Sequence, residues 1–318
     1  MTRFRTLRWR SLKKGDLVDL VAPGYSAHEE NLGKGILLLE SWGLRVRRPQ
    51  DLIVPFEFHA HTDAKRFEFL DRALRAKDSS AVWCVRGGYG ANRLLPLLLK
   101  KKAPPQPKMF IGISDNTTLH FLLNQKWKWS TLHGPILERL GSGTLPVEFV
   151  EELRQLVFGE LSEIVFADLE PLNKSALKKS KIQGAVLGGN LTTMQSLIGT
   201  ALPPNIKDRI LFLEDLGERG YRLDRMFEHF KQAQVLKGCK AIVFGHFLGG
   251  AEPGQPEKSF VDFALKRFAE DIKIPVFRGV DVGHGERQRT MPFLTKASIF
   301  KNQLQVDAGH VQVNIGER

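Results

Sequence analysis

The sequence has few cysteines and no long apolar run. Only Cys84 and Cys239 occur among 318 residues, and both lie in apolar, strand-like stretches. We expect them to be small buried side chains rather than parts of a disulfide framework or a metal site. No segment approaches the roughly 20 apolar residues of a transmembrane helix. The stretch DLVDLVAPGYSA is too short and too acidic for a secretory leader. These absences predict a cytoplasmic protein that does not enter a membrane.

The sequence also lacks the signatures of a nucleic-acid-binding module. Lysine and arginine number 47 against 35 acidic residues, which gives a net charge of +12. The basic clusters are not interleaved with stacking aromatics, and no zinc-finger spacing or RNA-binding motif occurs. A basic, solvated surface is therefore favoured over nucleic-acid binding. His59 and His61 resemble a metal pair, but no third ligand stands at a matching spacing, so no metal is expected.

Length and composition indicate a globular protein of about two domains. Apolar residues make up 42% and charged residues 26% of the chain, which is ordinary for such proteins. In the first half, short apolar runs alternate with helical patterns, which predicts a parallel sheet with helices on its faces. We predict an N-terminal α/β domain over 1–145, a connection over 146–182 and a smaller α/β domain, rich in strands, over 183–318. The last 30 residues predict a small β-rich sheet.

Residues with catalytic potential follow several predicted strands. In an open α/β sheet, ligands gather beyond the carboxyl ends of the strands. Acyl transfer needs a nucleophile, a base, a group that orients the base and backbone donors for the oxyanion. All of these types are present, although the pattern gives no distances. The residues are Gly87, Gly88, Tyr89 and Gly90, then Ser114 and Asp115, then Glu214 and Asp215, and finally His246 and His284.

Ser114, in the stretch GISDNTTLH, lies between an apolar run and a predicted helix. A serine on a sharp strand-to-helix turn has an exposed hydroxyl beside unpaired backbone N–H groups, which suits a nucleophile. Serine is also a favoured helix N-cap. Both interpretations are open on these residues alone. The nearby RGGYG lacks the spacing of a nucleotide-binding loop, so close backbone approach to a ligand or an oxyanion donor explains its glycines equally well.

The candidate histidines also allow structural roles. His284 lies between two glycines in DVGHGERQ, which favours an exposed loop and leaves a base or an ordinary turn histidine as alternatives. His246 and His133 lie between apolar residues, where a satisfied and partly buried histidine is favoured.

Glu214 ends an apolar strand, so its carboxylate needs a partner. That partner is either a histidine that Glu214 orients or an arginine, Arg222 or Arg225. Glu218 lies in the same turn and competes for the orienting role, but it is expected to be more exposed.

With these residues in view, the sequence resembles the LD-carboxypeptidase family, the muramoyltetrapeptide carboxypeptidases, to which the microcin C self-immunity peptidases are related. The resemblance covers most of the chain, from about residue 20 to about residue 295. It is carried by the order and spacing of several blocks, which are VRGGYGANRLLP, IGISDNTTLH, LHGPI, VLGGNLTTMQSLIGT, LFLEDLGERGYRLDRM, AIVFGHF and VDVGHGERQRTMPF.

The resemblance implies that Ser114 is the nucleophile, Glu214 the triad acid and His284 the base of a serine peptidase with its active site in a cleft between two domains. The backbone N–H groups of Gly88 and Asp115 are the predicted oxyanion hole. Predicted substrate contacts come from Gly87, Tyr89 and Asn190. In one respect the turn departs from the elbow of α/β-hydrolases, because Asn116 stands where they have a second glycine.

The resemblance further implies release of terminal D-alanine from murein tetrapeptides in peptidoglycan recycling or remodelling, without a cofactor, by a homodimer. Two alternatives stay open. One is a related peptidase that cleaves another acyl amide, such as a peptidyl-nucleotide antibiotic. The other is a murein-peptide binding protein without catalysis.

Overall fold

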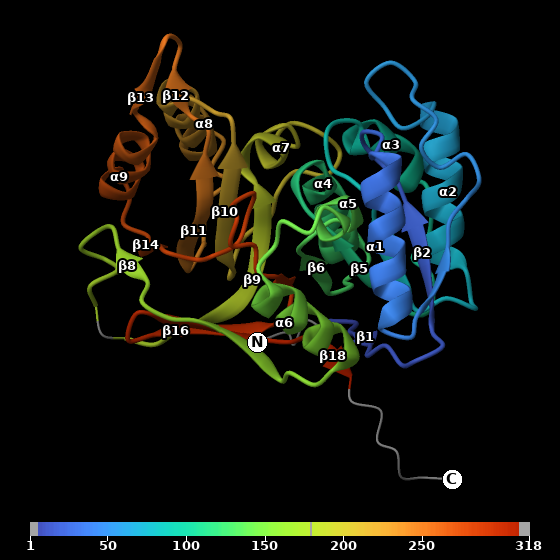
Figure 1. Ribbon diagram of the computed structural model, residues 1–318. Helices are drawn as coiled ribbons and strands as arrows, with labels where there is room; N and C mark the ends of the chain where they lie inside the picture. Colours follow the sequence, from blue (N-terminus) through green and yellow to red (C-terminus); the bar gives the residue numbers. More distant parts are fainter. Residues whose placement is uncertain (1–5, 179, 312–318) are drawn as a thin grey trace. The chain divides into compact units, whose positions relative to one another are not determined.

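The computed structural model describes residues 6–178 and 180–311, which form two compact units (Figure 1). Unit 1 contains the described residues up to 162, together with 289–294 and those from 308 onward. Unit 2 contains residues 163–288 and 295–307. Figure 1 shows the strands of each unit flanked by its helices. The predicted α/β fold class is confirmed.

Unit 1 is built on a six-stranded sheet in the order β15-β6-β5-β4-β2-β3. Five of these strands run parallel, and β15 is antiparallel to β6. The apolar runs that predicted the central strands are buried on both faces, as expected when helices cover a parallel sheet. The strands are β2 (Leu17–Val21), β3 (Arg45–Arg47), β4 (Ala81–Cys84), β5 (Met109–Gly112), β6 (Thr131–His133) and β15 (Met291–Phe293). A separate parallel pair joins β1 (Trp9–Arg10) to β18 (His310–Val311).

The helices of unit 1 follow the predicted periodicity. They are α1 (Glu29–Ser41), α2 (Asp63–Arg75), α3 (Ala91–Leu98), α4 (Thr117–Phe121), α5 (Leu137–Gly141) and α6 (Val147–Phe158), with a short 3₁₀ turn η1 (Ser114–Asn116) and a π turn η2 (Leu122–Lys126). In α2 the buried face contains Phe69, Leu70 and Leu74. Phe67 is only half-buried and lies under the ammonium group of Lys101.

The strand order of unit 1 reverses at β2. From β2 the chain moves outward to β3 and then returns to place β4 on the other side of β2. At such a switch point the loops that leave neighbouring strands diverge, and their backbones leave room for a ligand. The residues that follow β2, β4 and β5 meet at this edge, and Ser114 is among them.

Unit 2 is built on an eight-stranded sheet in the order β7-β17-β16-β9-β10-β11-β14-β8. Its parallel centre consists of β9 (Ile182–Asn190), β10 (Ile210–Leu216), β11 (Ala241–Leu248) and β14 (Val276–Arg278). Antiparallel edges come from β7 (Glu163–Phe166), β8 (Glu170–Pro171), β16 (Lys296–Phe300) and β17 (Gln303–Asp307). A hairpin of β12 (Ala251–Glu252) and β13 (Gln255–Ser259) stands apart. The helices are α7 (Leu191–Gln195), α8 (Gly220–Gln232) and α9 (Val261–Asp271).

The chain alternates between the units more often than its sequence suggests. Within the stretch expected as a connection, α6 belongs to unit 1 and β7 and β8 belong to unit 2. The expectation that the last 30 residues form one small β-rich sheet is wrong for those that the structure describes. Strand β15 extends the sheet of unit 1, whereas β16 and β17 extend the sheet of unit 2. Strand β15 pairs with β6 and β16 pairs with β9, so each of them satisfies backbone groups of a parallel strand in its sheet.

Both cysteines are free thiols. Cys84 is buried in β4 as expected, and burial raises the pKa of its thiol well above the ordinary value. Cys239 lies in the turn before β11 rather than in a strand. Burial also raises the pKa of its thiol, to about 11. Neither side chain is poised to act as a thiolate nucleophile.

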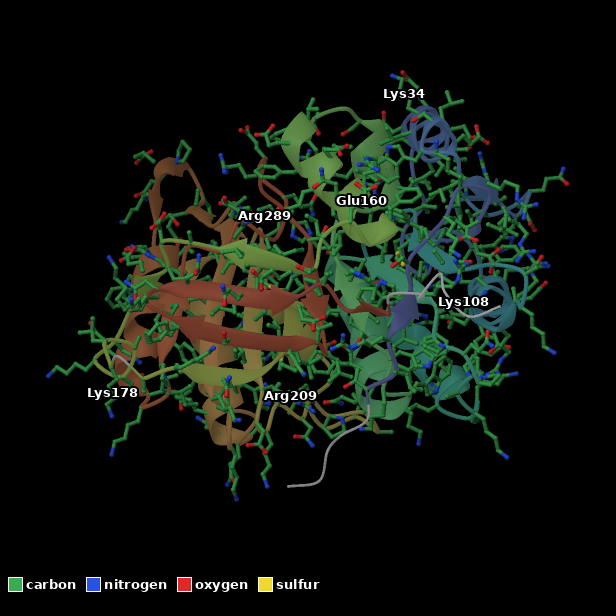
Figure 2. All side chains as sticks on the ribbon, turned by 90° about the horizontal axis from the view of Figure 1, so that it is seen from below. Lys34, Lys108, Glu160, Lys178, Arg209 and Arg289 are labelled. Atoms are coloured by element: carbon green, nitrogen blue, oxygen red, sulfur yellow. The ribbon has the colours of Figure 1, made fainter. Side chains whose placement is uncertain are left out.

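The basic side chains serve several different purposes. Lys34 and Lys178, labelled in Figure 2, project outward from α1 and from the loop after β8, and Lys34 pairs with Glu30 at 2.7 Å. Arg289 pairs with Glu152 inside unit 1. Lys108 is buried and donates to the Ala73 carbonyl and the Ser79 hydroxyl, and burial lowers its pKa to about 8. No helix within the described ranges is both long and apolar enough to cross a membrane.

The close packing of α1 on α5 gives a matched test with one kind of substitution. A Cβ at Gly35 would lie 2.6 Å from the Leu137 carbonyl oxygen, whereas a Cβ at Gly33, in the same helix, would meet nothing within 4 Å. We expect Gly35→Ala to lower the free energy of unfolding by about 1–3 kcal/mol through overpacking. Gly33→Ala should raise it by about 0.5–1 kcal/mol because alanine favours the helix. Urea unfolding of both variants checks this, and equal effects would contradict the packing.

Candidate active site

Ser114 stands at a strained turn between β5 and α4. Its φ of 65° is left-handed, which is uncommon for a residue other than glycine and concentrates at functional sites. Its neighbours Ile113 and Asp115 are buried, but Ser114 itself is partly exposed. Ser114 is the first residue of η1, while Asn116 occupies the N-cap position of α4. The helix-cap interpretation is therefore wrong, and the turn presents the hydroxyl as a strand-to-helix elbow would.

The glycine-rich loop after β4 lies directly against this turn. A Cβ at Gly87 would lie 2.8 Å from the Ser114 Cβ and 3.3 Å from its Oγ, so only glycine allows this approach. The Tyr25 N–H donates to the Gly87 carbonyl at 2.8 Å, and the Asn116 amide donates to the Arg86 carbonyl at 3.2 Å. The loops after β2, β4 and β5 are thereby tied together around the serine.

Asp115 fixes the far end of the same loop. Its carboxylate is buried and accepts the N–H of Ala91, the first residue of α3, at 2.8 Å. Burial raises the pKa of Asp115 to about 6, although the hydrogen bonds from Ala91 and Gly90 act in the opposite direction. Asp115 therefore connects the turn that carries Ser114 to the start of α3.

Tyr89 and His59 form an aromatic group beside the glycine-rich loop. Tyr89 is 46% exposed, and the ring centres of Phe58 and His59 lie 5.7 and 5.4 Å from its ring. The neighbouring His61 accepts the Thr62 N–H through Nδ1. Over residues 6–178 and 180–311, no three His, Cys, Asp or Glu side chains are grouped so that they could hold a metal ion.

Unit 2 brings Glu214 and His284 together. Glu214 is fully buried in β10, and its Oε2 lies 2.6 Å from the Nδ1 of His284. With the Glu214 oxygen as acceptor, Nδ1–H is the donor of this hydrogen bond, and Nε2 is the basic nitrogen of the ring. The partner of Glu214 is thus a histidine. Of the two arginine alternatives, Arg222 pairs with Glu218 at 3.4 Å and Arg225 lies over the ring of Tyr221.

His284 lies in a loop, as predicted, but the expectation of exposure is wrong. Its side chain is 18% exposed, and Gly283 and Gly285 on either side are buried. These glycines provide room for neighbouring side chains, because a Cβ at Gly285 would lie 2.6 Å from the Nδ1 of His246. His133 is fully buried, and His246 is partly buried, as predicted.

Asp215 and Asn190 support the acid of this pair. Asp215 is buried next to Glu214 and accepts the backbone N–H and hydroxyl of Thr192 at 2.8 and 2.9 Å, at the start of α7. Burial raises its pKa to about 6. The Asn190 amide donates to Asp215 at 3.2 Å, and its oxygen accepts the Thr193 N–H. Asn190 thus has a structural role here, and its contact with substrate stays a prediction.

Some residues of the site were missed by reasoning from strand ends. Tyr25 follows β2 in APGYSA, a strand end that carries the same kind of turn signal as RGGYG. His120 stands four residues after Asn116, on the same helix face. Its imidazole bridges the Gly112 carbonyl at 2.9 Å and the Thr131 hydroxyl at 2.8 Å. Burial lowers the pKa of His120 to about 4, so it supports the turn as a neutral ring.

These features define a class, namely two-unit α/β proteins with a strained serine turn in one unit and a buried acid–histidine pair in the other. The model of the LD-carboxypeptidase N-terminal domain matches residues 18–134, and that of the C-terminal domain matches residues 183–299. The chain belongs to the LD-carboxypeptidase family, which indicates carboxypeptidase activity.

Individual relatives agree with this family. The chain is 36% identical to a putative carboxypeptidase of Rickettsia conorii, with 77% of this chain and 76% of that protein covered. It is 30% identical to a probable murein peptide carboxypeptidase of Bacillus subtilis, covering 91% and 90%. The structure is similar to muramoyltetrapeptide carboxypeptidase from Oxalobacter formigenes, with a TM-score of 0.78, 25% identity, and 93% and 100% of the two chains covered.

The raised pKa of Asp115 predicts how stability depends on pH. The folded protein holds this proton up to about pH 6, whereas the unfolded chain releases it near 3.8, so the stabilisation is complete below 3.8 and is lost as pH rises to about 6. We expect the unfolding free energy of the wild type, relative to Asp115→Asn, to fall by about 3 kcal/mol across this range.

Urea unfolding at several pH values measures this difference. Asp271→Asn is the control, because Lys231 lowers the pKa of Asp271 and its small contribution is instead lost as pH falls. A pH-independent difference between wild type and Asp115→Asn would contradict the prediction.

Proposed function

We propose that the protein is a serine-type LD-carboxypeptidase that releases the terminal D-alanine from murein tetrapeptides by means of Ser114, His284 and Glu214. The observation that carries the proposal is the 2.6 Å hydrogen bond between the buried Glu214 and His284, in a chain of the LD-carboxypeptidase family. The strained and partly exposed Ser114 supplies the complementary nucleophile.

The proposed reaction follows from the chemistry of these groups. Ser114 Oγ attacks the carbonyl carbon that precedes D-alanine, and His284 Nε2 accepts its proton. Glu214 accepts the Nδ1–H, holds the required tautomer and stabilises the imidazolium. His284 then donates the proton to the nitrogen of D-alanine as the C–N bond breaks. A water molecule, deprotonated by His284, hydrolyses the resulting acyl ester and regenerates Ser114.

Backbone N–H groups of Gly88 and Asp115 are proposed to stabilise the oxyanion. Asp115 directly follows the nucleophile, and Gly88 lies in the loop whose Gly87 approaches Ser114. One such donor contributes about 3 kcal/mol to lowering the barrier. Tyr89 and the Gly87 backbone, on the same loop, are the proposed substrate contacts in unit 1, and Asn190 is the proposed contact in unit 2.

The choice of a murein substrate is supported by the relatives. The probable murein peptide carboxypeptidase of Bacillus subtilis is 30% identical over 91% of this chain. The microcin C7 self-immunity protein of Escherichia coli is less similar, with 26% identity over 77% of this chain. Cleavage of a peptidyl-nucleotide amide is therefore the second candidate. A cytoplasmic site of action in murein recycling, and a homodimer, are proposed on the resemblance alone.

Ser114→Ala should abolish release of D-alanine from a murein tetrapeptide, with kcat falling at least about 1,000-fold because no nucleophile remains. The measurement is free D-alanine with chelator present. Ser41→Ala, which alters an exposed hydroxyl of α1 in the same unit, is the control and should match the wild type. Equal release by Ser114→Ala and wild type would overturn the proposed nucleophile. No release by the wild type would direct the assay to peptidyl-nucleotide amides.

Glu214→Gln should lower kcat about 1,000- to 10,000-fold with little change in KM, because a glutamine amide can donate to Nδ1 and move the proton to Nε2. Glu218→Gln is the matched control, four residues further on in the turn after β10, where the carboxylate pairs with the exposed Arg222. We expect it to stay within about threefold of the wild type. If both variants lose activity equally, Glu214 has no special role as the orienting acid.

A further inference from the structure

A β-bulge places a second histidine opposite the catalytic acid. Between β10 and β11, Leu213 pairs with Phe244 and Asp215 pairs with Phe247. One residue of β10, Glu214, therefore faces two residues of β11, Gly245 and His246. Bulges of this kind concentrate next to active sites, where they redirect side chains. The bulge brings His246 to the loop that carries His284.

His246 holds that loop at two points. Its backbone N–H donates to the Val282 carbonyl at 2.9 Å, and its imidazole Nδ1 accepts the Gly285 N–H at 3.1 Å. The two contacts lie on either side of His284 in the chain. Gly285 approaches so closely that a Cβ there would lie 2.6 Å from the Nδ1. The loop conformation that points His284 at Glu214 therefore depends on the imidazole of His246.

The contact with Gly285 fixes the protonation state of His246. Nδ1 can accept an N–H only when it carries no proton, so the neutral ring has its hydrogen on Nε2. Several ionisable groups face this ring. Glu214 approaches from β10, His284 and Asp281 approach from the loop, and Asp281 itself pairs with Arg287. Burial lowers the pKa of His246, while the two carboxylates act to raise it. Burial thus favours the neutral ring.

We infer that His246 is a positioning residue for His284, holding the loop 282–285 as a neutral imidazole and releasing it when protonated. The inference rests on the proposed function, because it assigns His284 as the base. Protonation would replace the Nδ1 acceptor by a donor that opposes the Gly285 N–H. It would also place a positive charge beside the histidine that must itself become an imidazolium during the reaction. The active form therefore requires both imidazoles to be neutral.

The kinetic test compares two substitutions at this position. His246→Leu removes the acceptor, and kcat should fall about 100-fold with KM changed little, because the base is misplaced. His246→Asn supplies an oxygen close to the position of Nδ1 and should recover most of that loss. The acid side of the kcat/KM profile should be steeper in wild type than in His246→Asn, by about one in limiting slope, because the variant lacks the titration of His246.

The matched control is His229→Leu. This histidine lies on α8 in the same unit and contacts Gln195 through Nδ1, away from the loop. Its profile should superpose on that of the wild type. If His246→Leu keeps the wild-type kcat, or if the Leu and Asn variants lose activity equally, His246 has no positioning role and the inference fails.

A readout without substrate separates this inference from the proposed function. In ¹⁵N-histidine-labelled protein, NMR should show His246 as the neutral Nε2–H tautomer at pH 7. The Nδ1–H resonance of His284, bonded to Glu214, should broaden or shift in His246→Leu and be retained in His246→Asn. If the wild type releases no D-alanine but the NMR results are as expected, the proposed function is refuted and the inference about His246 is not. An Nδ1–H tautomer of His246, or a His284 resonance unchanged in His246→Leu, would refute the inference.

Discussion

The hydrogen bond between Glu214 and His284 determines the conformation of unit 2 around these two residues. A carboxylate with no exposed surface would cost several kcal/mol if it were left ionised without partners. The bond can form only if the loop after β14 returns across the ends of β10 and β11. The bulge in the pairing of these strands and the glycines beside His284 make this return possible. The geometry of the loop is thus a consequence of burying the acid.

The two units support their candidate residues by the same device. In each unit, a buried aspartate directly follows the candidate catalytic residue. Its carboxylate accepts a backbone N–H from the first turn of the helix that follows the neighbouring strand of the sheet. Asp115 binds the start of α3, and Asp215 binds the start of α7. Burial raises the pKa of both to about 6. The pairs Ser114–Asp115 and Glu214–Asp215 therefore follow one pattern. The first residue is the candidate catalytic residue, and the second holds its backbone in place by hydrogen bonding to a helix N-terminus.

Local sequence patterns predicted the parallel strands and most helices, because these depend on periodicity. Strand ends and family blocks singled out Ser114, Glu214 and His284, whose catalytic roles stay predictions. The assignment of β15 to one sheet and of β16 to another could not be predicted, since pairing between distant strands leaves no local periodicity. The role of His246 could not be predicted from the sequence for a similar reason. Its apolar neighbours indicate burial, but the shift in register that turns it toward Gly285 exists only once β10 and β11 have paired.

Strain at Ser114 is tolerated because its surroundings determine the turn more strongly than its own preferences do. A left-handed conformation costs a residue with a Cβ about 1–2 kcal/mol. Against this stand the hydrogen bonds of Asn116, Asp115 and His120, each worth about 1 kcal/mol, and none of them involves the serine hydroxyl. The supporting contacts are therefore made by the neighbours of Ser114, and the hydroxyl is left available for chemistry. A residue that only capped a helix would have the opposite arrangement, with its own oxygen as the supporting contact.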